Sequence, residues 1–241
     1  MRYILSSIRS SEDYRKNTQQ FNFSDLLFSM FLYVVVLVLY YGLGKVFTAK
    51  DGVLTNEFIF IATGIVSLIA IAVVFLFCYF RNQKFSTIGF DPTHAKISLK
   101  YGLILMICVT IIFCISAIMS GTSFRRDIYS VIMWLFYYLI YIAFVEELIF
   151  RGYIGTRLYG FFQNKLLGIS ITGLLFTFMH IPMQMLMSHM NFVEYVSNSW
   201  GNFIFIFLLH YIFQILYAKF NSILAPILFH FAWDYVQWLL F

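Results

Sequence analysis

Residues 144–152 read Phe-Val-Glu-Glu-Leu-Ile-Phe-Arg-Gly, which places two adjacent acids, Glu146 and Glu147, inside an otherwise apolar run. An acid near the centre of a membrane helix costs about 2.5–3.5 kcal/mol, so a chain that keeps such a pair is expected to use it. On a helix, Glu147 and Arg151 are one turn apart and can form an ion pair. Glu146 then points about 140° away from Arg151, toward another partner. The run therefore predicts a membrane helix that carries a functional polar site.

The composition of the whole chain agrees with a membrane location. Hydrophobic residues make up 61% of the chain and charged residues 11%, with a mean hydropathy of +0.83. These values exclude an ordinary soluble domain, in which about a quarter of the residues are charged. Repeated apolar runs of about 20 residues favour helices over the alternating pattern of a barrel. We predict an all-α polytopic bundle of about seven transmembrane helices, with seven to eight as the expected range.

The predicted spans divide the chain into three parts. They are residues 25–46, 57–80, 101–120, 127–150, 166–180, 200–217 and 221–241, with a polar connector at 151–165. Residues 1–24 form a basic N-terminal tail, residues 25–126 the N-terminal helices, and residues 127–241 the part that carries the expected site. Pro182 is expected to end the fifth span, since proline disfavours a helical conformation in the residue before it.

The charge distribution predicts an orientation rather than a nucleic-acid partner. The net charge of +5 is small and scattered along the chain. Most of the 16 Lys and Arg residues lie in segments that share one side of the membrane if the N-terminus is inside. The positive-inside rule then predicts a cytoplasmic N-terminus and an outer C-terminus. We expect an integral protein of a bacterial cell membrane.

Ionisable residues within the apolar spans gather in the C-terminal half of the chain. They are Glu146, Glu147, His180, His210, His230 and Asp234. His180 follows Phe176 by four residues and Asp234 follows His230 by four, so each pair shares one helix face. His210 has Gln214 one turn away and is interpreted as a hydrogen-bonded structural residue. Three helices thus each present a polar turn, and such residues at lipid depth indicate a functional site.

This set of side chains suits hydrolysis of a peptide bond inside the membrane. Glu147, paired with Arg151, is expected to stay ionised, whereas Glu146 is the better candidate for general base. A histidine opposite Glu146 could share the attacking water, and His230 with Asp234 could stabilise the oxyanion or orient the scissile carbonyl. The chain contains neither G-x-S-x-G nor H-E-x-x-H. Glu146, His180 and His230 could also hold a divalent metal such as zinc, but we favour a site without one.

The three motifs together resemble those of the CPBP intramembrane proteases. Glu-Glu-x-x-x-Arg at 146–151, Phe-x-x-x-His at 176–180 and His-x-x-x-Asp at 230–234 occur in the family's order. That family includes the Ras-converting CAAX endopeptidases and the bacterial Abi or bacteriocin-immunity proteins, and its members have been described both as metalloproteases and as glutamate proteases. The resemblance covers roughly residues 127–241.

The resemblance implies a role for each motif residue. Glu146 and His180 would activate the water, Glu147 and Arg151 would brace the site, and His230 with Asp234 would form the oxyanion-stabilising pair. Many relatives have Asn at the position of Asp234. An ionised Asp cannot donate a hydrogen bond, so Asp234 is either protonated, or orients His230, or favours a metal.

Three functions are compatible with these residues. The first is an intramembrane endopeptidase that acts on a membrane-associated or lipid-modified peptide or protein. The second is a non-catalytic membrane protein in bacteriocin self-immunity or assembly, in which the same residues form a structural network. The third, a proton-coupled transporter, is least favoured because no pair of broken helices is apparent. Neither the substrate nor the oligomeric state follows from the sequence.

Overall fold

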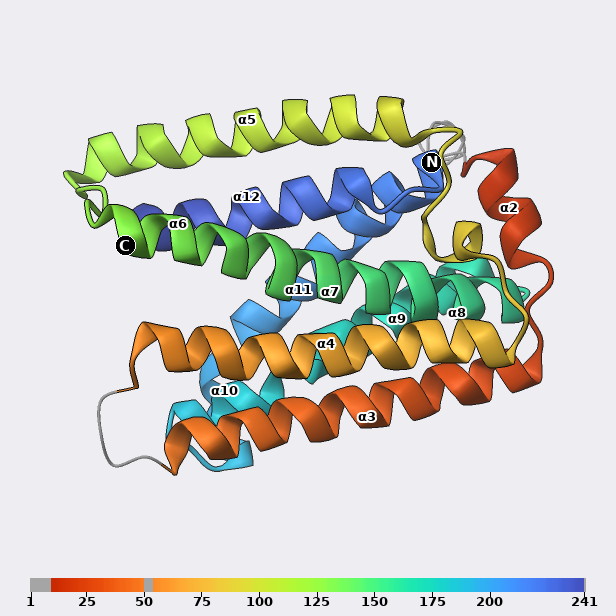
Figure 1. The fold of residues 1–241 in the computed structure, drawn as a ribbon, viewed down its shortest axis with the longest axis horizontal. Helices are drawn as coiled ribbons and strands as arrows, with labels where there is room; N and C mark the ends of the chain where they lie inside the picture. Colours follow the sequence, from red (N-terminus) through yellow and green to blue (C-terminus); the bar gives the residue numbers. More distant parts are fainter. Residues whose placement is uncertain (1–9, 50–53, 241) are drawn as a thin grey trace.

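The computed structural model describes residues 10–49 and 54–240, which form the all-α bundle predicted (Figure 1). The N-terminal elements are α2 (Glu12–Thr18), α3 (Phe23–Thr48), α4 (Asn56–Phe80), a 3₁₀ turn at Phe85–Ile88, and α5 (Ala95–Ser120). The C-terminal elements are α6 (Ile128–Phe136), α7 (Val145–Glu147), α8 (Thr156–Phe161), α9 (Lys165–Met179), α10 (Ile181–Met187), α11 (Phe192–Phe220) and α12 (Leu224–Leu240).

Helices α6, α7 and α8 belong to one continuous helix of 34 residues, Ile128–Phe161. Two π-helical segments, Tyr137–Phe144 and Leu148–Gly155, flank the acids of α7. Such widened turns occur frequently at functional sites. The predicted connector at 151–165 is therefore wrong over most of its length. Arg151, Thr156 and Arg157 are buried rather than solvated. Arg157 donates to backbone and side-chain oxygens inside the bundle, among them the carbonyl oxygen of Gly152 at 3.0 Å.

Within residues 10–49 and 54–240, six helices are long and apolar enough to cross a membrane, which makes the chain a polytopic helical membrane protein. The prediction of seven spans is corrected toward six, because α12 has only 17 residues and falls short of these six in length. It starts at Leu224 rather than 221, since Asn221 adopts a left-handed conformation that ends α11. Helix α11 starts at Phe192 rather than 200, because Asn191 and Glu194 form a capping box there.

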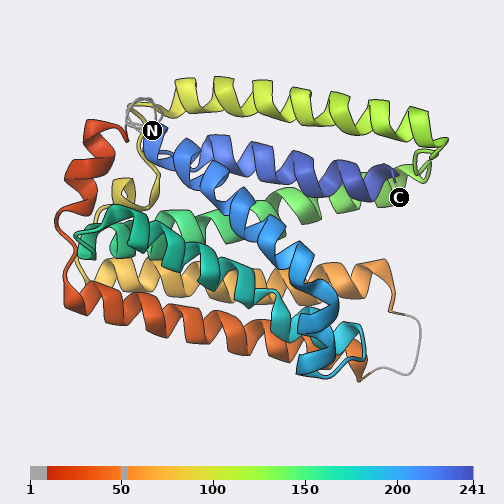
Figure 2. The same cartoon turned by 180° about the vertical axis from the view of Figure 1, so that it is seen from behind.

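Part of the predicted N-terminal tail packs into the bundle; residues 1–9 of that tail lie outside the described residues. Tyr14 of α2 is fully buried, and its hydroxyl accepts a hydrogen bond from Gln214 Nε2 at 3.0 Å. Its ring lies 5.7 Å from that of Tyr217, edge to face. Helix α2 is thereby attached to the end of α11, at the end of the bundle where α3 begins (Figure 2).

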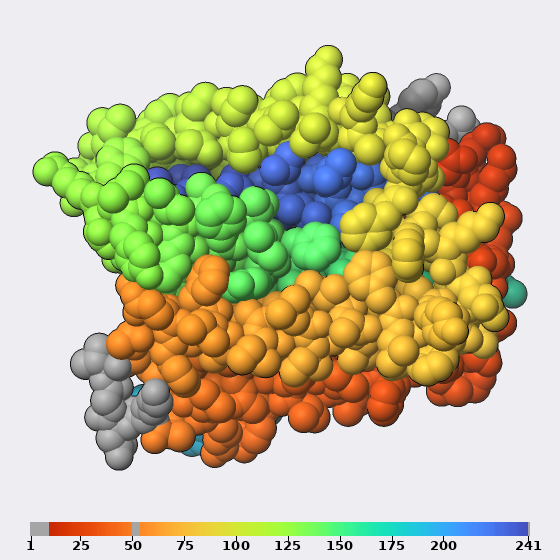
Figure 3. Space-filling view, viewed as in Figure 1, coloured from red at the N-terminus to blue at the C-terminus, as the bar shows by residue number. Residues whose placement is uncertain are grey.

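Helix α12 runs beside α5 and behind the long α6–α8 helix, and its surface is visible between the two in Figure 3. Its first turn is held by α5, because the Ala225 N–H donates to Ser98 Oγ at 3.0 Å. A Cβ atom on Gly102 would lie 2.9 Å from Ala225 Cα, so glycine permits the close approach of the two helices. This packing sets the position of the helix that carries His230.

We expect Gly102→Ala to lower stability by about 1–3 kcal/mol, since an added methyl group would overpack the contact between α5 and α12. The matched control is Gly42→Ala on α3, where an added Cβ meets nothing within 4 Å. Thermal unfolding in detergent would measure both variants. Equal stability of the two would show that the α5–α12 contact can relax without cost.

Candidate active site

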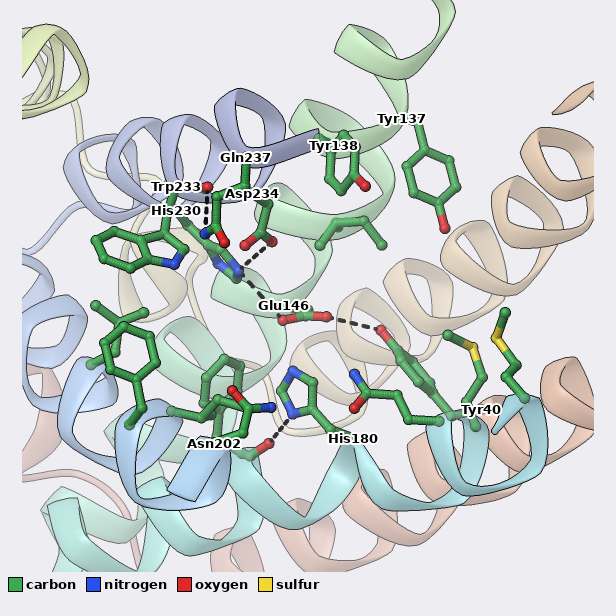
Figure 4. Close-up of a pocket in the computed structure, with 18 of the residues that line it drawn as sticks. Tyr40, Tyr137, Tyr138, Glu146, His180, Asn202, His230, Trp233, Asp234 and Gln237 are labelled. Carbon is green, nitrogen blue, oxygen red and sulfur yellow. Dashed lines mark hydrogen bonds and ion pairs between the residues drawn. The ribbon is translucent and has the colours of Figure 1, made fainter. Parts of the chain in front are cut away.

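A cavity of about 660 Å³ lies between α3, α4, the long α6–α8 helix, α9–α10, α11 and α12. Aromatic and aliphatic side chains form most of its wall, including Phe47, Trp134 and Phe205. Polar side chains line it from five of these elements, among them Tyr40, Glu146, His180, Gln184, Asn202, His230, Asp234 and Gln237. In Figure 4, Glu146 lies between His230 and Asp234 on one side and His180 on the other.

Glu147 and Arg151 form the ion pair predicted from their spacing. Arg151 Nη1 lies 3.1 Å from Glu147 Oε1, and both side chains are fully buried. The guanidinium carbon also lies over two aromatic rings, 4.0 Å from the centroid of Phe176 and 4.7 Å from that of Phe213. Both rings can stabilise the cation through their electron-rich faces.

His230 connects this ion pair with the other two acids. Its Nδ1 lies 2.8 Å from Glu147 Oε1, and its Nε2 lies 3.3 Å from Asp234 Oδ2 and 3.7 Å from Glu146 Oε2. The ring stacks on Phe213 at 4.9 Å between centroids. An imidazolium can donate from both ring nitrogens, whereas a neutral imidazole can donate from only one. Carboxylates on both sides of the ring are thus arranged for the charged form.

Glu146 is buried and held from α3. Its Oε1 accepts a hydrogen bond from the Tyr40 hydroxyl at 3.3 Å, and its side chain lies at the cavity. Its Oε2 has no hydrogen-bond partner among the residues that the structure describes. The sequence analysis missed Tyr40, which is one of 17 tyrosines and lies in an apolar helix more than 100 positions before Glu146. The carboxylate is thereby fixed through Oε1, while Oε2 keeps only the ion-pair contact with His230 Nε2 at 3.7 Å.

His180 lies at the junction of α9, which ends at Met179, and α10, which begins at Ile181 and has Pro182 in its first turn. The fifth span does not stop there as predicted, because the candidate membrane span continues to Met187. His180 Nδ1 lies 2.9 Å from the Phe176 carbonyl oxygen. A carbonyl oxygen can only accept, so Nδ1 carries the proton and Nε2 is left as an acceptor. His180 lines the cavity, which allows this free acceptor to meet a bound water.

The two remaining ionisable residues of the spans, His210 and Asp234, differ in their relation to this cluster. His210 is fully buried, its Nε2 lies 3.2 Å from the Ile169 carbonyl oxygen, and it does not line the cavity. Asp234 keeps 30% of its side-chain surface exposed beside His230. The Asp234 carboxylate can accept a hydrogen bond from His230 Nε2 and so orient the imidazole ring.

The residues suggested as metal ligands do not converge on one point. Among residues 10–49 and 54–240, no group of three or more His, Cys, Asp or Glu side chains is arranged to hold a metal ion. His180 is directed to the Phe176 carbonyl oxygen, while His230 is directed to Glu147 and Asp234.

Part of the chain matches a known protein family. Residues 128–236 match the family described as type II CAAX prenyl endopeptidase Rce1-like. No curated protein and no solved structure matches the chain. The matched region contains every motif residue of the cluster, from Glu146 to Asp234, whereas Tyr40 lies outside it. Together with the clustering of its three motifs, this match identifies residues 128–236 as a domain of the type II CAAX prenyl endopeptidase Rce1-like (CPBP) family.

Proposed function

We propose that this protein is an intramembrane endopeptidase that cleaves a membrane-associated or lipid-modified peptide or protein with water activated by Glu146. Membership of the CAAX endopeptidase family implies a protease with a protein substrate. The observation that carries the proposal is the state of Glu146: a buried carboxylate at a cavity, held through Oε1 by Tyr40, whose Oε2 has no hydrogen-bond partner among the described residues and lies 3.7 Å from His230 Nε2. A general base needs this combination of fixed position and an available lone pair.

In the proposed reaction, water binds between Glu146 Oε2 and His180 Nε2. Glu146 takes a proton as the water oxygen attacks the carbonyl carbon. His230, held as an imidazolium by Glu147 and Asp234, stabilises the negative charge that develops on the carbonyl oxygen. The C–N bond then breaks, and Glu146 returns its proton to the leaving amine. Asp234 acts by orienting His230 rather than by donating a hydrogen bond.

The cavity wall supports an apolar substrate. Its volume of about 660 Å³ and its aromatic lining suit a hydrophobic segment or a lipid chain beside the scissile bond. The charge distribution supports a cytoplasmic N-terminus, and the resemblance to bacterial Abi proteins supports a bacterial cell membrane. A non-catalytic role in bacteriocin self-immunity or assembly is the competing function, in which the same cluster is only structural.

Glu146→Gln is expected to abolish cleavage without changing the amount of protein, because the amide keeps the shape of the carboxylate but cannot accept the proton. Mass spectrometry of peptide termini in membranes and medium would compare the variant with wild type at matched levels. Glu57→Gln at the exposed start of α4 is the control. Identical termini in all three strains, with any resistance phenotype retained, would favour the non-catalytic immunity role.

Arg151→Met is expected to lower the amount of folded protein, since removing one partner of a buried ion pair costs about 3–5 kcal/mol. The double variant Glu147→Gln/Arg151→Met removes both charges while leaving an acceptor for His230, and should recover the amount of protein. Immunoblotting of membranes and thermal unfolding would measure both variants. A single variant as abundant and stable as wild type would contradict the bracing role of Arg151.

Tyr40→Phe should lower kcat by about 10- to 100-fold with little change in KM, since one hydrogen bond to a charged group contributes about 1.5–3 kcal/mol. The ring that lines the cavity is retained, so substrate binding should persist. Tyr33→Phe is the control, because Tyr33 lies on the same helix, packs on Phe150 and does not line the cavity. Steady-state kinetics would measure kcat and KM of both variants with a substrate identified from the peptide termini. Equal effects of the two variants on kcat would exclude a positioning role for Tyr40.

A further inference from the structure

The buried part of the cavity lining lies around Glu146, and its more exposed part lies toward one end of the bundle. Its floor is made by buried residues: Phe176, Phe213 and His230 are each at most 5% exposed. Toward its rim lie Met187 and Phe205, which are 45% and 41% exposed. Other rim residues come from the last turns of α3 and α12, the first turn of α4 and the second turn of α6: Phe47, Gln237, Ile59 and Trp134. All these turns lie at the end of the bundle where the label C stands in Figure 1, here called the mouth end.

The opposite end of the bundle is closed below Glu146. Every residue from Leu148 to Leu158 is buried, so the long helix is packed on all sides there. Arg157 fills this region: its guanidinium lies 3.9 Å from the centroid of Tyr153 and 4.4 Å from that of Phe21, and it donates to Gln83 Oε1. A substrate therefore reaches Glu146 from the mouth end.

The two ends differ in positive charge. The closed end carries Arg15, Lys16, Arg81, Lys84, Lys96, Lys100, Lys165 and Lys219. Among the described residues, the mouth end carries Lys45, Arg125 and Arg126. Basic residues close to the ends of spans determine orientation, and the more basic end stays in the cytoplasm. Acidic residues contribute little to this rule.

We propose that the active-site cavity opens on the extracytoplasmic face of the membrane, so that the substrate is a peptide or protein segment presented at the outer surface. The proposal rests on the proteolytic function proposed above and specifies its substrate class. A segment that has already crossed the membrane, or the outer part of a membrane protein, meets Glu146 directly. A protein that remains in the cytoplasm meets the end closed by Arg157.

Cysteine accessibility tests the proposal. In a chain whose Cys78, Cys108 and Cys114 are replaced by serine, single cysteines are introduced as Asn202→Cys, Arg126→Cys and Lys84→Cys. Asn202 is exposed and lines the cavity, Arg126 is exposed at the mouth end, and Lys84 is exposed at the closed end. A membrane-impermeant methanethiosulfonate reagent is added to intact cells and to sealed inverted vesicles. Cleavage dependent on Glu146 is followed in the same membranes by peptide termini.

We expect Asn202→Cys and Arg126→Cys to be labelled in intact cells and to lose labelling in inverted vesicles, with the reverse result for Lys84→Cys. Labelling of Asn202→Cys only in inverted vesicles would overturn the proposal. So would a cysteine at this position that is labelled from neither side of the membrane but is labelled after detergent is added. If either of these two results occurred while Glu146-dependent cleavage persisted, only the outward orientation of the cavity would be refuted. Labelling of Asn202→Cys in intact cells that show no Glu146-dependent cleavage would refute the proposed proteolytic function. The outward orientation of the cavity would still hold.

Discussion

The buried ion pair between Glu147 and Arg151 is the constraint on which the site depends. Two buried charges are tolerated only when each has a partner that stabilises it. Arg151 forms an ion pair with Glu147 and lies over the faces of the Phe176 and Phe213 rings. Glu147 also meets His230 Nδ1 at 2.8 Å. The long helix and α12 are thus linked at one point, and the orientation of His230 follows from a pair that does not itself line the cavity.

This arrangement determines which of the two adjacent acids faces the cavity. Glu147 is occupied by Arg151 and His230, so the neighbouring Glu146 is the acid left to face the cavity. Two adjacent residues on one helix thereby acquire different environments, because side chains at successive positions point about 100° apart. The widened turns on both sides of α7 accompany this change of direction. Helix α3 completes the site from outside the matched region, through the hydroxyl of Tyr40.

Much of this arrangement could be predicted from local sequence. The spacing of Glu147 and Arg151 predicted their ion pair, and the spacing of His230 and Asp234 predicted their contact. Apolar runs predicted the helices, although the 34-residue helix was cut at 150 because Arg151 and Arg157 resembled the start of a polar connector. Pattern alone does not show that a buried arginine is satisfied by carbonyl oxygens and rings from other helices. For the same reason Tyr40 was missed, since its partner is distant in the chain.

The most direct test of the central claim is cleavage by the purified protein in liposomes, with a substrate identified from cellular peptide termini, in the presence of a strong zinc chelator. If Glu146 and His180 activate water as described, wild-type protein keeps its cleavage rate in chelator, and Glu146→Gln has no activity with or without added zinc. Loss of wild-type activity in chelator that zinc restores would contradict the account. It would assign the activation of water to a metal held by these residues.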